Sequence, residues 1–284
     1  MNASTLQGQR IAFIGPGTMA EAMIAGLVRE GVAAPEAITA AGPRQERLDT
    51  LKARYGIQGT TDNAAAARQA DVVVLSIKPQ VLGKVLPELH GQIAPDALVL
   101  SIVAGAPIAR LSEGMAHQAV VRAMPNTPAQ IGMGITVWTA SPQVTKTQRA
   151  MARGVLAALG EEIFMEDEVY LDMATALSGT GPAYVFLFME ALVDAGVHLG
   201  FPRRVAERLV VQTVQGAAAY YERQQGEVHL AHLRNQVTSP GGTSAAALYY
   251  LEKAGFRTAI SRAVWAAYER ALSLAQNGKP QPPK

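Results

Sequence analysis

The chain has 284 residues, of which 49% are hydrophobic and 17% charged, and its 25 Lys and Arg against 23 Asp and Glu give a formal net charge of +2. This length favours two domains. The charged share lies below the usual value of about 25%, which indicates an oligomer with a small polar surface. The near balance of positive and negative charges argues against a nucleic-acid partner. The chain has no cysteine, which excludes disulfides, thiolate nucleophiles and Cys-ligated metal sites.

The first part of the chain alternates short apolar runs with Ala-rich helical stretches, from Arg10 to about Glu162. Near-continuous apolar strands separated by helices are typical of a parallel sheet that is covered on both faces. The runs predict strands over Ile11–Ile14, Ala37–Ala40, Asp71–Ser76, Ala97–Ser101, Ala119–Ala123 and Ile135–Trp138.

The second part, from about Met165, lacks this pattern and predicts long helices. Pro182 and Pro202 are each placed to occupy a first helical position, where a missing N–H costs nothing. The helix expected over Pro182–Leu199 is apolar on nearly every side, so we expect a subunit interface to cover it. Gln281–Lys284 is expected to be a disordered tail.

Neither the first ten residues nor the most apolar run of the chain predicts a membrane partner. Met1–Arg10 is polar and resembles no secretory signal. The most apolar run, Ala183–Met189, is followed by Glu190 and Asp194 before the roughly 20 residues needed to span a bilayer. We therefore expect a buried helix in a soluble, cytoplasmic protein.

A glycine-containing turn follows the first predicted strand directly and opens an amphipathic helix: Gly15-Pro16-Gly17-Thr18-Met19-Ala20. This is the G-x-G-x-x-A form of the dinucleotide fingerprint, in which Gly15 permits the tight turn, Gly17 lets the backbone approach a pyrophosphate and Ala20 allows close helix–strand packing. The pyrophosphate would meet the N–H groups at the helix N-terminus.

The fold class that follows is α/β. We expect a doubly wound, Rossmann-like dinucleotide-binding domain over 1–164 and an all-helical domain over 165–284.

The cofactor preference rests on the region after the second strand. An NAD site usually places an acidic residue there for the ribose 2′-OH, but no acid lies between Glu36 and Glu46. Arg44 stands where a charged hydrogen bond could hold a 2′-phosphate, which favours NADPH over NADH. The alternative is that Arg44 is a solvated arginine at a helix start.

Several segments together resemble the pyrroline-5-carboxylate reductase family, over about residues 11 to 275. The segments that carry the resemblance are Phe13–Met23, Ser76-Ile77-Lys78-Pro79, Arg122–Pro128, Leu177–Tyr184, Asp194–Val197 and Val237–Ser244. The resemblance implies transfer of hydride from NADPH, or less often NADH, to the C5 imine carbon of 1-pyrroline-5-carboxylate, giving L-proline. It also implies a homodimer through the helical domain, often assembled into a ring of five dimers.

The resemblance implies roles for individual residues. The cofactor would contact Gly15, Pro16, Gly17, Thr18, Met19, Ala20, Gly42, Arg44, Asn63, Ser76, Ile77, Lys78, Pro79 and Ala104. The substrate would contact Glu227, Ser239, Gly241, Gly242, Thr243 and Ser244; Ser244 occupies the family's catalytic position, and the neighbouring Thr243 is expected to assist it. Gly42 stands where the family often has a serine, and Ser244 where it has a threonine. Asn63 could also cap the helix that follows it.

The Ser239–Ser244 turn suits this chemistry. It precedes an Ala-rich helical run, so its N–H groups would lie at a helix N-terminus, and its glycines allow a carboxylate to approach closely. An imine nitrogen is basic enough to arrive protonated, so a hydroxyl such as that of Ser244 can suffice without a histidine acid. The alternative is a capped interdomain turn.

Two other functions compete with this reading. A β-hydroxyacid dehydrogenase would need a catalytic lysine in the helical domain, but no lysine lies between Lys146 and Lys253. A non-catalytic NADP-binding sensor would need the dinucleotide turn alone. His229 and His232 have helical spacing but lack a carboxylate partner, so no metal site is expected.

Overall fold

The computed structural model describes residues 6–224 and 227–277, with side chains up to residue 274. The predicted tail Gln281–Lys284 therefore lies outside the described residues. Contacts divide the chain into two compact units, Met1–Thr180 with Ala266–Lys284, and Gly181–Trp265. The domains predicted as 1–164 and 165–284 follow the change in secondary structure instead, and their boundary stays a prediction.

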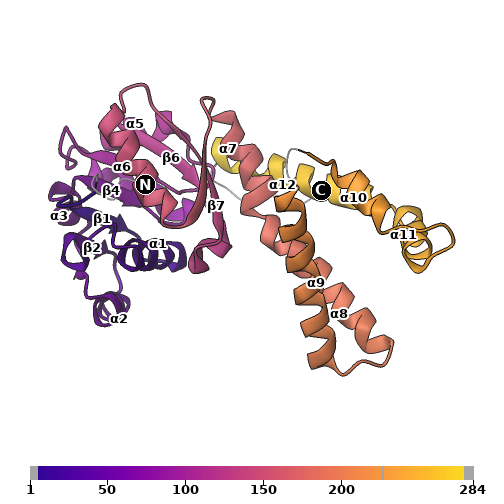
Figure 1. Cartoon of the computed structure of the whole chain (residues 1–284). Helices are drawn as coiled ribbons and strands as arrows, with labels where there is room; N and C mark the ends of the chain where they lie inside the picture. The colour runs from indigo at the N-terminus through magenta and orange to yellow at the C-terminus, as the bar shows by residue number, and fades with distance from the viewer. Residues whose placement is uncertain (1–5, 225–226, 278–284) are drawn as a thin grey trace. The chain divides into compact units, whose positions relative to one another are not determined.

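The first unit contains one eight-stranded sheet in the order β3-β2-β1-β4-β5-β6-β7-β8 (Figure 1). The strands are β1 Ile11–Ile14, β2 Ile38–Ala41, β3 Gln58–Thr60, β4 Val72–Leu75, β5 Leu98–Ser101, β6 Val120–Met124, β7 Gly134–Ala140 and β8 Gly160–Phe164. The strand order reverses beside β1, which pairs in parallel with both β2 and β4. In doubly wound sheets such a switch point is where ligands bind.

Each of the six predicted strands is present, but the sheet differs from the expectation in two ways. β3 and β8 were not predicted, and β7 pairs antiparallel with β6. The expectation of a wholly parallel sheet is therefore wrong at this pair. The connection from β6 to β7 is one short loop with a 3-10 turn over Thr127–Ile131, which is too short for a parallel crossover.

Helices cover both faces of the sheet. Their bounds are α1 Thr18–Arg29, α2 Gln45–Tyr55, α3 Asn63–Arg68, α4 Leu82–Leu89, α5 Ile108–Met115 and α6 Lys146–Ala157. Alternate residues of β1 point into separate cores: Phe13 packs with side chains of α1, α2 and α6, whereas Ile14 packs with side chains of α3, α4 and α5. Burial of both faces confirms the doubly wound architecture.

The chain leaves the sheet through α7 (Val169–Ala174) and a π-helical turn over Thr175–Gly179. The second unit is entirely helical in its described residues. Its helices are α8 Gly181–His198, α9 Arg203–Arg223, α10 Leu230–Gln236, α11 Thr243–Lys253 and the first part of α12 Phe256–Asn277. Pro182 is the second residue of α8 and Pro202 precedes α9 as its N-cap, each within one residue of the predicted position.

Helices α8 and α9 lie side by side (Figure 1) and form a small core of Val193, Ala206 and Val210. Gly196 permits this contact, because a Cβ there would lie 3.0 Å from the Cβ of Ala206. Most other apolar side chains of this unit are exposed, Phe186 by 64% and Leu187 by 67%. The single chain therefore leaves most of α8 exposed, as expected of a helix that a subunit interface covers, and that cover stays a prediction.

One segment, Val169–His198, is long and apolar enough to cross a membrane when judged by length and composition, and 11% of its most apolar window is buried. The core helices of soluble proteins and signal sequences meet the same criteria of length and composition.

Candidate functional site

The dinucleotide turn is held by the loop that follows β4. Gly15 leaves β1 with a φ of +93°, and a Cβ at this position would lie 2.5 Å from Cγ2 of Ile77. Ser76 donates its backbone N–H to the carbonyl of Ile14 over 2.9 Å, and its hydroxyl lies 2.9 Å from the carbonyl oxygen of Gly15. Only glycine meets both demands of position 15, a left-handed φ and close approach.

Gly42, at the end of β2, closes the turn from the other side. A Cβ at position 42 would lie 2.6 Å from Cδ of Pro16, and the Gly42 N–H donates to the carbonyl of Thr60. The proline ring inside the fingerprint therefore leaves no room for a side chain at position 42. This explains why a glycine stands where the resemblance implies a serine.

The start of α1 faces open space. Gly17 is the N-cap with an ordinary φ of −81°, and a Cβ there would meet no protein atom within 4 Å. Thr18, Met19 and Ala20 are the first helical residues, whose N–H groups receive no acceptor from the helix itself. Ala20 is fully buried, as the fingerprint predicts. This arrangement suits a phosphate group.

Two arginines of the next connection have different surroundings. Arg44 is exposed at the N-cap position of α2 and forms no ion pair with any residue that the structure describes. Arg47 instead contacts the turn itself, because its Nε donates to the carbonyl of Pro16 over 2.9 Å. Sequence reasoning selected Arg44 and missed Arg47.

Asn63 is the first residue of α3 rather than its cap. Asp62 caps this helix by accepting the N–H of Ala65 over 2.9 Å, so the capping alternative for Asn63 is wrong. The Asn63 amide donates to Glu88 over 2.7 Å. Its Oδ1 is buried and has no partner among the described residues, which leaves an acceptor available to a ligand donor.

The other predicted cofactor residues lie in loops at the carboxyl ends of β4 and β5. Ile77 packs on Gly15, exposed Lys78 is the N-cap of a 3-10 turn that begins at Pro79, and Ala104 is half-buried before Gly105, which has a φ of +64°. These ends meet at one edge of the sheet, beside the switch point between β1 and β4. The structure thus places the predicted cofactor residues of the first unit around one edge.

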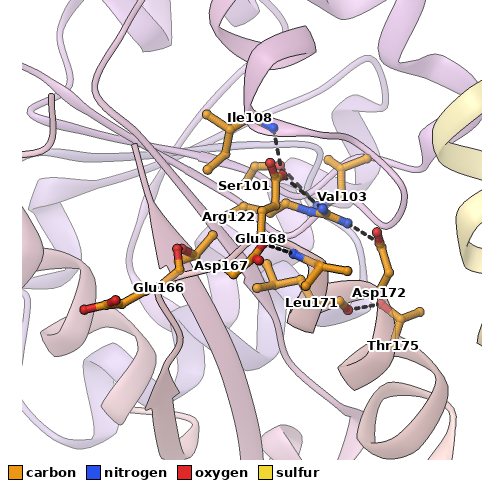
Figure 2. Close-up of polar contacts among 12 residues, drawn as sticks. Ser101, Val103, Ile108, Arg122, Glu166, Asp167, Glu168, Leu171, Asp172 and Thr175 are labelled. Carbon is orange, nitrogen blue, oxygen red and sulfur yellow. Dashed lines mark hydrogen bonds and ion pairs between the residues drawn. The ribbon is translucent and has the colours of Figure 1, made fainter. Parts of the chain in front are cut away.

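A buried arginine that the sequence analysis gave no role organises the end of β6. Figure 2 shows Glu168 and Asp172 reaching toward the guanidinium of Arg122. Arg122 is 1% exposed and pairs with Glu168 over 3.0 Å and with Asp172 over 2.7 Å. The Glu168 carboxylate also accepts the N–H of Ile108, which ties the start of α5 to the same cluster.

The sequence did carry a signal for this cluster. An arginine inside an apolar strand needs a charged partner, and Glu168 and Asp172 have the i, i+4 spacing that puts two side chains on one helix face. The cluster joins β6, α5 and the start of α7, and so fixes where the chain leaves the sheet.

The predicted substrate turn lies in the second unit. Gly241 has a φ of +70°, and Gly242 is the N-cap of α11, with a Cβ there in collision with the Ser239 hydroxyl. Thr243 and half-buried Ser244 are the first two residues of α11. A turn with close backbone and a helix start after it are therefore present as expected. Their contact with a substrate stays a prediction.

Glu227 is exposed and follows directly after two residues that the structure does not describe. Its predicted contact with substrate likewise stays a prediction. Among the described residues no group of three His, Asp or Glu side chains could hold a metal.

The fold and the turn define the class of protein. A doubly wound sheet with a glycine turn at its switch point, an open helix N-terminus and an arginine nearby is the site of a dinucleotide-binding protein.

Comparison with known proteins defines the family. The profile described as pyrroline-5-carboxylate reductase dimerisation matches residues 168–274, and that of NADP oxidoreductase, coenzyme F420-dependent, matches residues 10–105. Pyrroline-5-carboxylate reductases from Synechocystis sp. and Pseudomonas aeruginosa are 43% and 42% identical, over 94% of this chain and 98% and 97% of theirs. The chain belongs to the pyrroline-5-carboxylate reductase family, and this confirms the resemblance found in its motifs.

A solved structure agrees over nearly the whole chain. The crystal structure of Plasmodium falciparum pyrroline carboxylate reductase with NADP bound has a TM-score of 0.86 and 31% sequence identity, and the match covers 95% of this chain and 99% of that one. The two-part fold predicted from the sequence is thereby confirmed.

The two glycines of the turn should respond differently to alanine. We expect Gly17→Ala to change the free energy of unfolding by about 1 kcal/mol or less, since its Cβ meets no protein atom, yet to weaken NADPH binding more than about tenfold by blocking approach of the pyrophosphate. Gly15→Ala should instead lower stability by about 2–4 kcal/mol, through the left-handed φ and the contact with Ile77.

Urea unfolding and a fluorescence titration with NADPH measure the two effects. Undiminished NADPH binding by Gly17→Ala would show that the open space before α1 is not the cofactor site.

Proposed function

We propose that this chain is a pyrroline-5-carboxylate reductase that transfers hydride from NADPH, or less readily NADH, to the C5 imine carbon of 1-pyrroline-5-carboxylate. The product is L-proline, and the reaction is the last step of proline biosynthesis. The main support is family membership over 94% of the chain, joined to a dinucleotide turn whose open side faces solvent.

The cofactor fits the residues of the first unit. The N–H groups of Thr18, Met19 and Ala20 are available to the pyrophosphate, the unpartnered Oδ1 of Asn63 can accept a ribose hydroxyl, and Arg44 can pair with a 2′-phosphate. When bound, the nicotinamide supplies the hydride. The loop Ser76–Pro79 with Ala104 would line the rest of the site.

The substrate carries a carboxylate beside a ring imine. The N–H groups at the start of α11 would bind the carboxylate, with Ser239, Gly241 and Gly242 shaping the turn so that it can approach. The Ser244 hydroxyl would orient the imine nitrogen, with Thr243 and Glu227 beside the substrate. Serine lacks the methyl group that restricts the rotamers of threonine, so its hydroxyl is held less tightly.

The reaction needs one hydride at C5 and one proton on nitrogen. Because the imine nitrogen is much more basic than a carbonyl oxygen, it can take its proton from water before the hydride arrives, and no strong acid has to be supplied by the protein. The chain's contribution is then to position the imine carbon and exclude water.

We expect the protein to work as a homo-oligomer in the cytoplasm, without nucleic-acid or membrane partners. A second copy would cover the exposed apolar side chains of α8 and α9, among them Phe186 and Leu187. Five such dimers in a ring would make a decamer.

Turnover tests the assignment. We expect purified protein to oxidise NADPH only when 1-pyrroline-5-carboxylate is added, and Ser244→Ala to lower kcat about a hundredfold by removing the imine hydrogen bond while NADPH affinity changes less than about twofold. The matched control is Ser261→Ala, an exposed serine of α12, which should keep full activity.

No turnover with intact NADPH binding would favour a sensor over an enzyme, and oxidation of a β-hydroxyacid instead would favour the dehydrogenase. An unchanged kcat in Ser244→Ala would remove this residue from the mechanism.

Arg44 tests the cofactor preference. Loss of a charged hydrogen bond in Arg44→Ala should raise the Kd for NADPH by about tenfold or more, and leave that for NADH unchanged because NADH lacks the 2′-phosphate. Lys52→Ala, which removes an exposed charge from the same helix, is the control. An equal loss for both cofactors would mean that Arg44 is not the phosphate ligand.

Light scattering tests the assembly. We expect a particle of two 30.0 kDa chains or of ten, and Leu187→Asp should shift it toward monomer by burying a charge in the interface. The control is Lys84→Asp, which introduces the same residue at an exposed position of α4. A wild-type monomer at micromolar concentration would contradict the proposed dimer.

A further inference from the structure

We infer that Arg47 is a positioning residue of the dinucleotide turn, which holds the turn's carbonyl groups so that its N–H groups face the cofactor. This inference deepens the proposed function and rests on the cofactor site described above. It assigns Arg47 to the part of the cofactor that NADPH and NADH share, and separates it from Arg44.

Arg47 contacts the turn at two successive carbonyls. Its Nε donates to Pro16 over 2.9 Å, and one terminal nitrogen lies 3.4 Å from the carbonyl oxygen of Gly17. The same terminal nitrogen donates to a carboxylate oxygen of Glu21 over 2.6 Å. A planar guanidinium can make these contacts together because its donors point in fixed, diverging directions.

Glu21 anchors the arginine. It lies in the first turn of α1, and its second carboxylate oxygen accepts from Arg54 and from the Tyr55 hydroxyl, each over 3.0 Å. Burial acts to raise the pKa of Glu21, but the hydrogen bonds from Arg47 and Tyr55 and the charges of Arg47 and Arg54 outweigh it, so the pKa is lowered. The side chains of Arg47 and Glu21 are 23% and 19% exposed, which limits screening of this pair by water.

Protein donors engage each carbonyl along the turn. Ile14 accepts from the N–H of Ser76, Gly15 from the N–H of Gly17, and Gly17 from the N–H of Glu21. The Pro16 carbonyl accepts from Arg47, and no other donor to it occurs in the described part of the chain.

The dependence of the Pro16 carbonyl on Arg47 has an electrostatic consequence. A pyrophosphate is attracted by N–H groups and repelled by carbonyl oxygens. With Arg47 in place, the Pro16 carbonyl is fixed against α2, and the N–H groups of Thr18 to Ala20 form the ligand-facing side. Without it, that carbonyl has no donor, and the peptide after Pro16 loses the contact that sets its orientation.

Two nitrogens of the Arg47 guanidinium already donate to protein acceptors rather than to a 2′-phosphate. Its Nε and one terminal nitrogen serve Pro16, Gly17 and Glu21, whereas Arg44 is exposed without an ion pair among the described residues. The two arginines should therefore have separable effects: Arg44 on the choice between cofactors, and Arg47 on affinity for both.

Equilibrium binding of NADPH and of NADH, in the absence of substrate, tests this. We expect Arg47→Met to raise the Kd of both cofactors by the same factor, about tenfold, and Arg47→Lys to recover part of the loss, because an ammonium keeps the charge but cannot reach both carbonyls. Arg54→Met is the matched control: it removes another partner of Glu21 that does not contact the turn, and both Kd values should stay within about twofold.

A loss confined to NADPH would place Arg47 on the 2′-phosphate and overturn the inference, as would unchanged binding of both cofactors. An equal loss in Arg54→Met would assign the effect to the Glu21 network instead. If Arg47→Met fails to fold in urea-unfolding measurements, Arg47→Lys decides, because it must still show an equal loss for both cofactors. Since no substrate is used, failure of the proposed reduction leaves these results unaffected.

Discussion

The close approach of Ile77 to Gly15 is the constraint on which the nucleotide site depends. β1 and β4 are parallel neighbours, so the chain segments that leave them start side by side, and the absence of a side chain at Gly15 lets the two segments touch. Ser76 joins them further through the Ile14 and Gly15 carbonyls. One wall of the site is fixed in this way, and the side of the turn at Gly17 stays open, since a Cβ there would meet no protein atom within 4 Å.

The sequence predicted those features that are encoded in consecutive residues, and it did not predict those that depend on contacts between distant parts of the chain. β1, β4 and β5 are buried at every residue and read as apolar runs, and the fingerprint lies in six consecutive residues. β3 is a three-residue edge strand of Gln, Gly and Thr, and β8 begins Gly-Glu-Glu, so neither carries such a run. Arg47 could not be placed because its partner in the turn lies 31 residues away in the chain; for Arg122, whose partner Asp172 lies 50 residues away, the i, i+4 spacing of Glu168 and Asp172 was the one available signal.

The two arginines also illustrate why buried charge is informative. Arg122 lies within an apolar strand yet pairs with two carboxylates, and its Nε has no partner among the described residues. Removing both carboxylates would leave the Arg122 guanidinium unpaired in a poorly solvated place, which costs more than the pairs contribute. Arg122 and Arg47 each hold a connection after a strand, and neither has the exposure expected of a residue that merely solubilises the surface. The family motif around Arg122 thus contains a structural requirement.

The thin core between α8 and α9 has a consequence for the life of the protein in a cell. Three buried side chains cannot offset the conformational entropy lost in ordering two long helices, so this half must gain much of its stability from association with another copy. Its durability then follows mass action, and rises with the number of copies present. A newly synthesised chain, or a chain in dilute solution, would expose the apolar side chains of this half to chaperones and proteases until it associates with a second copy.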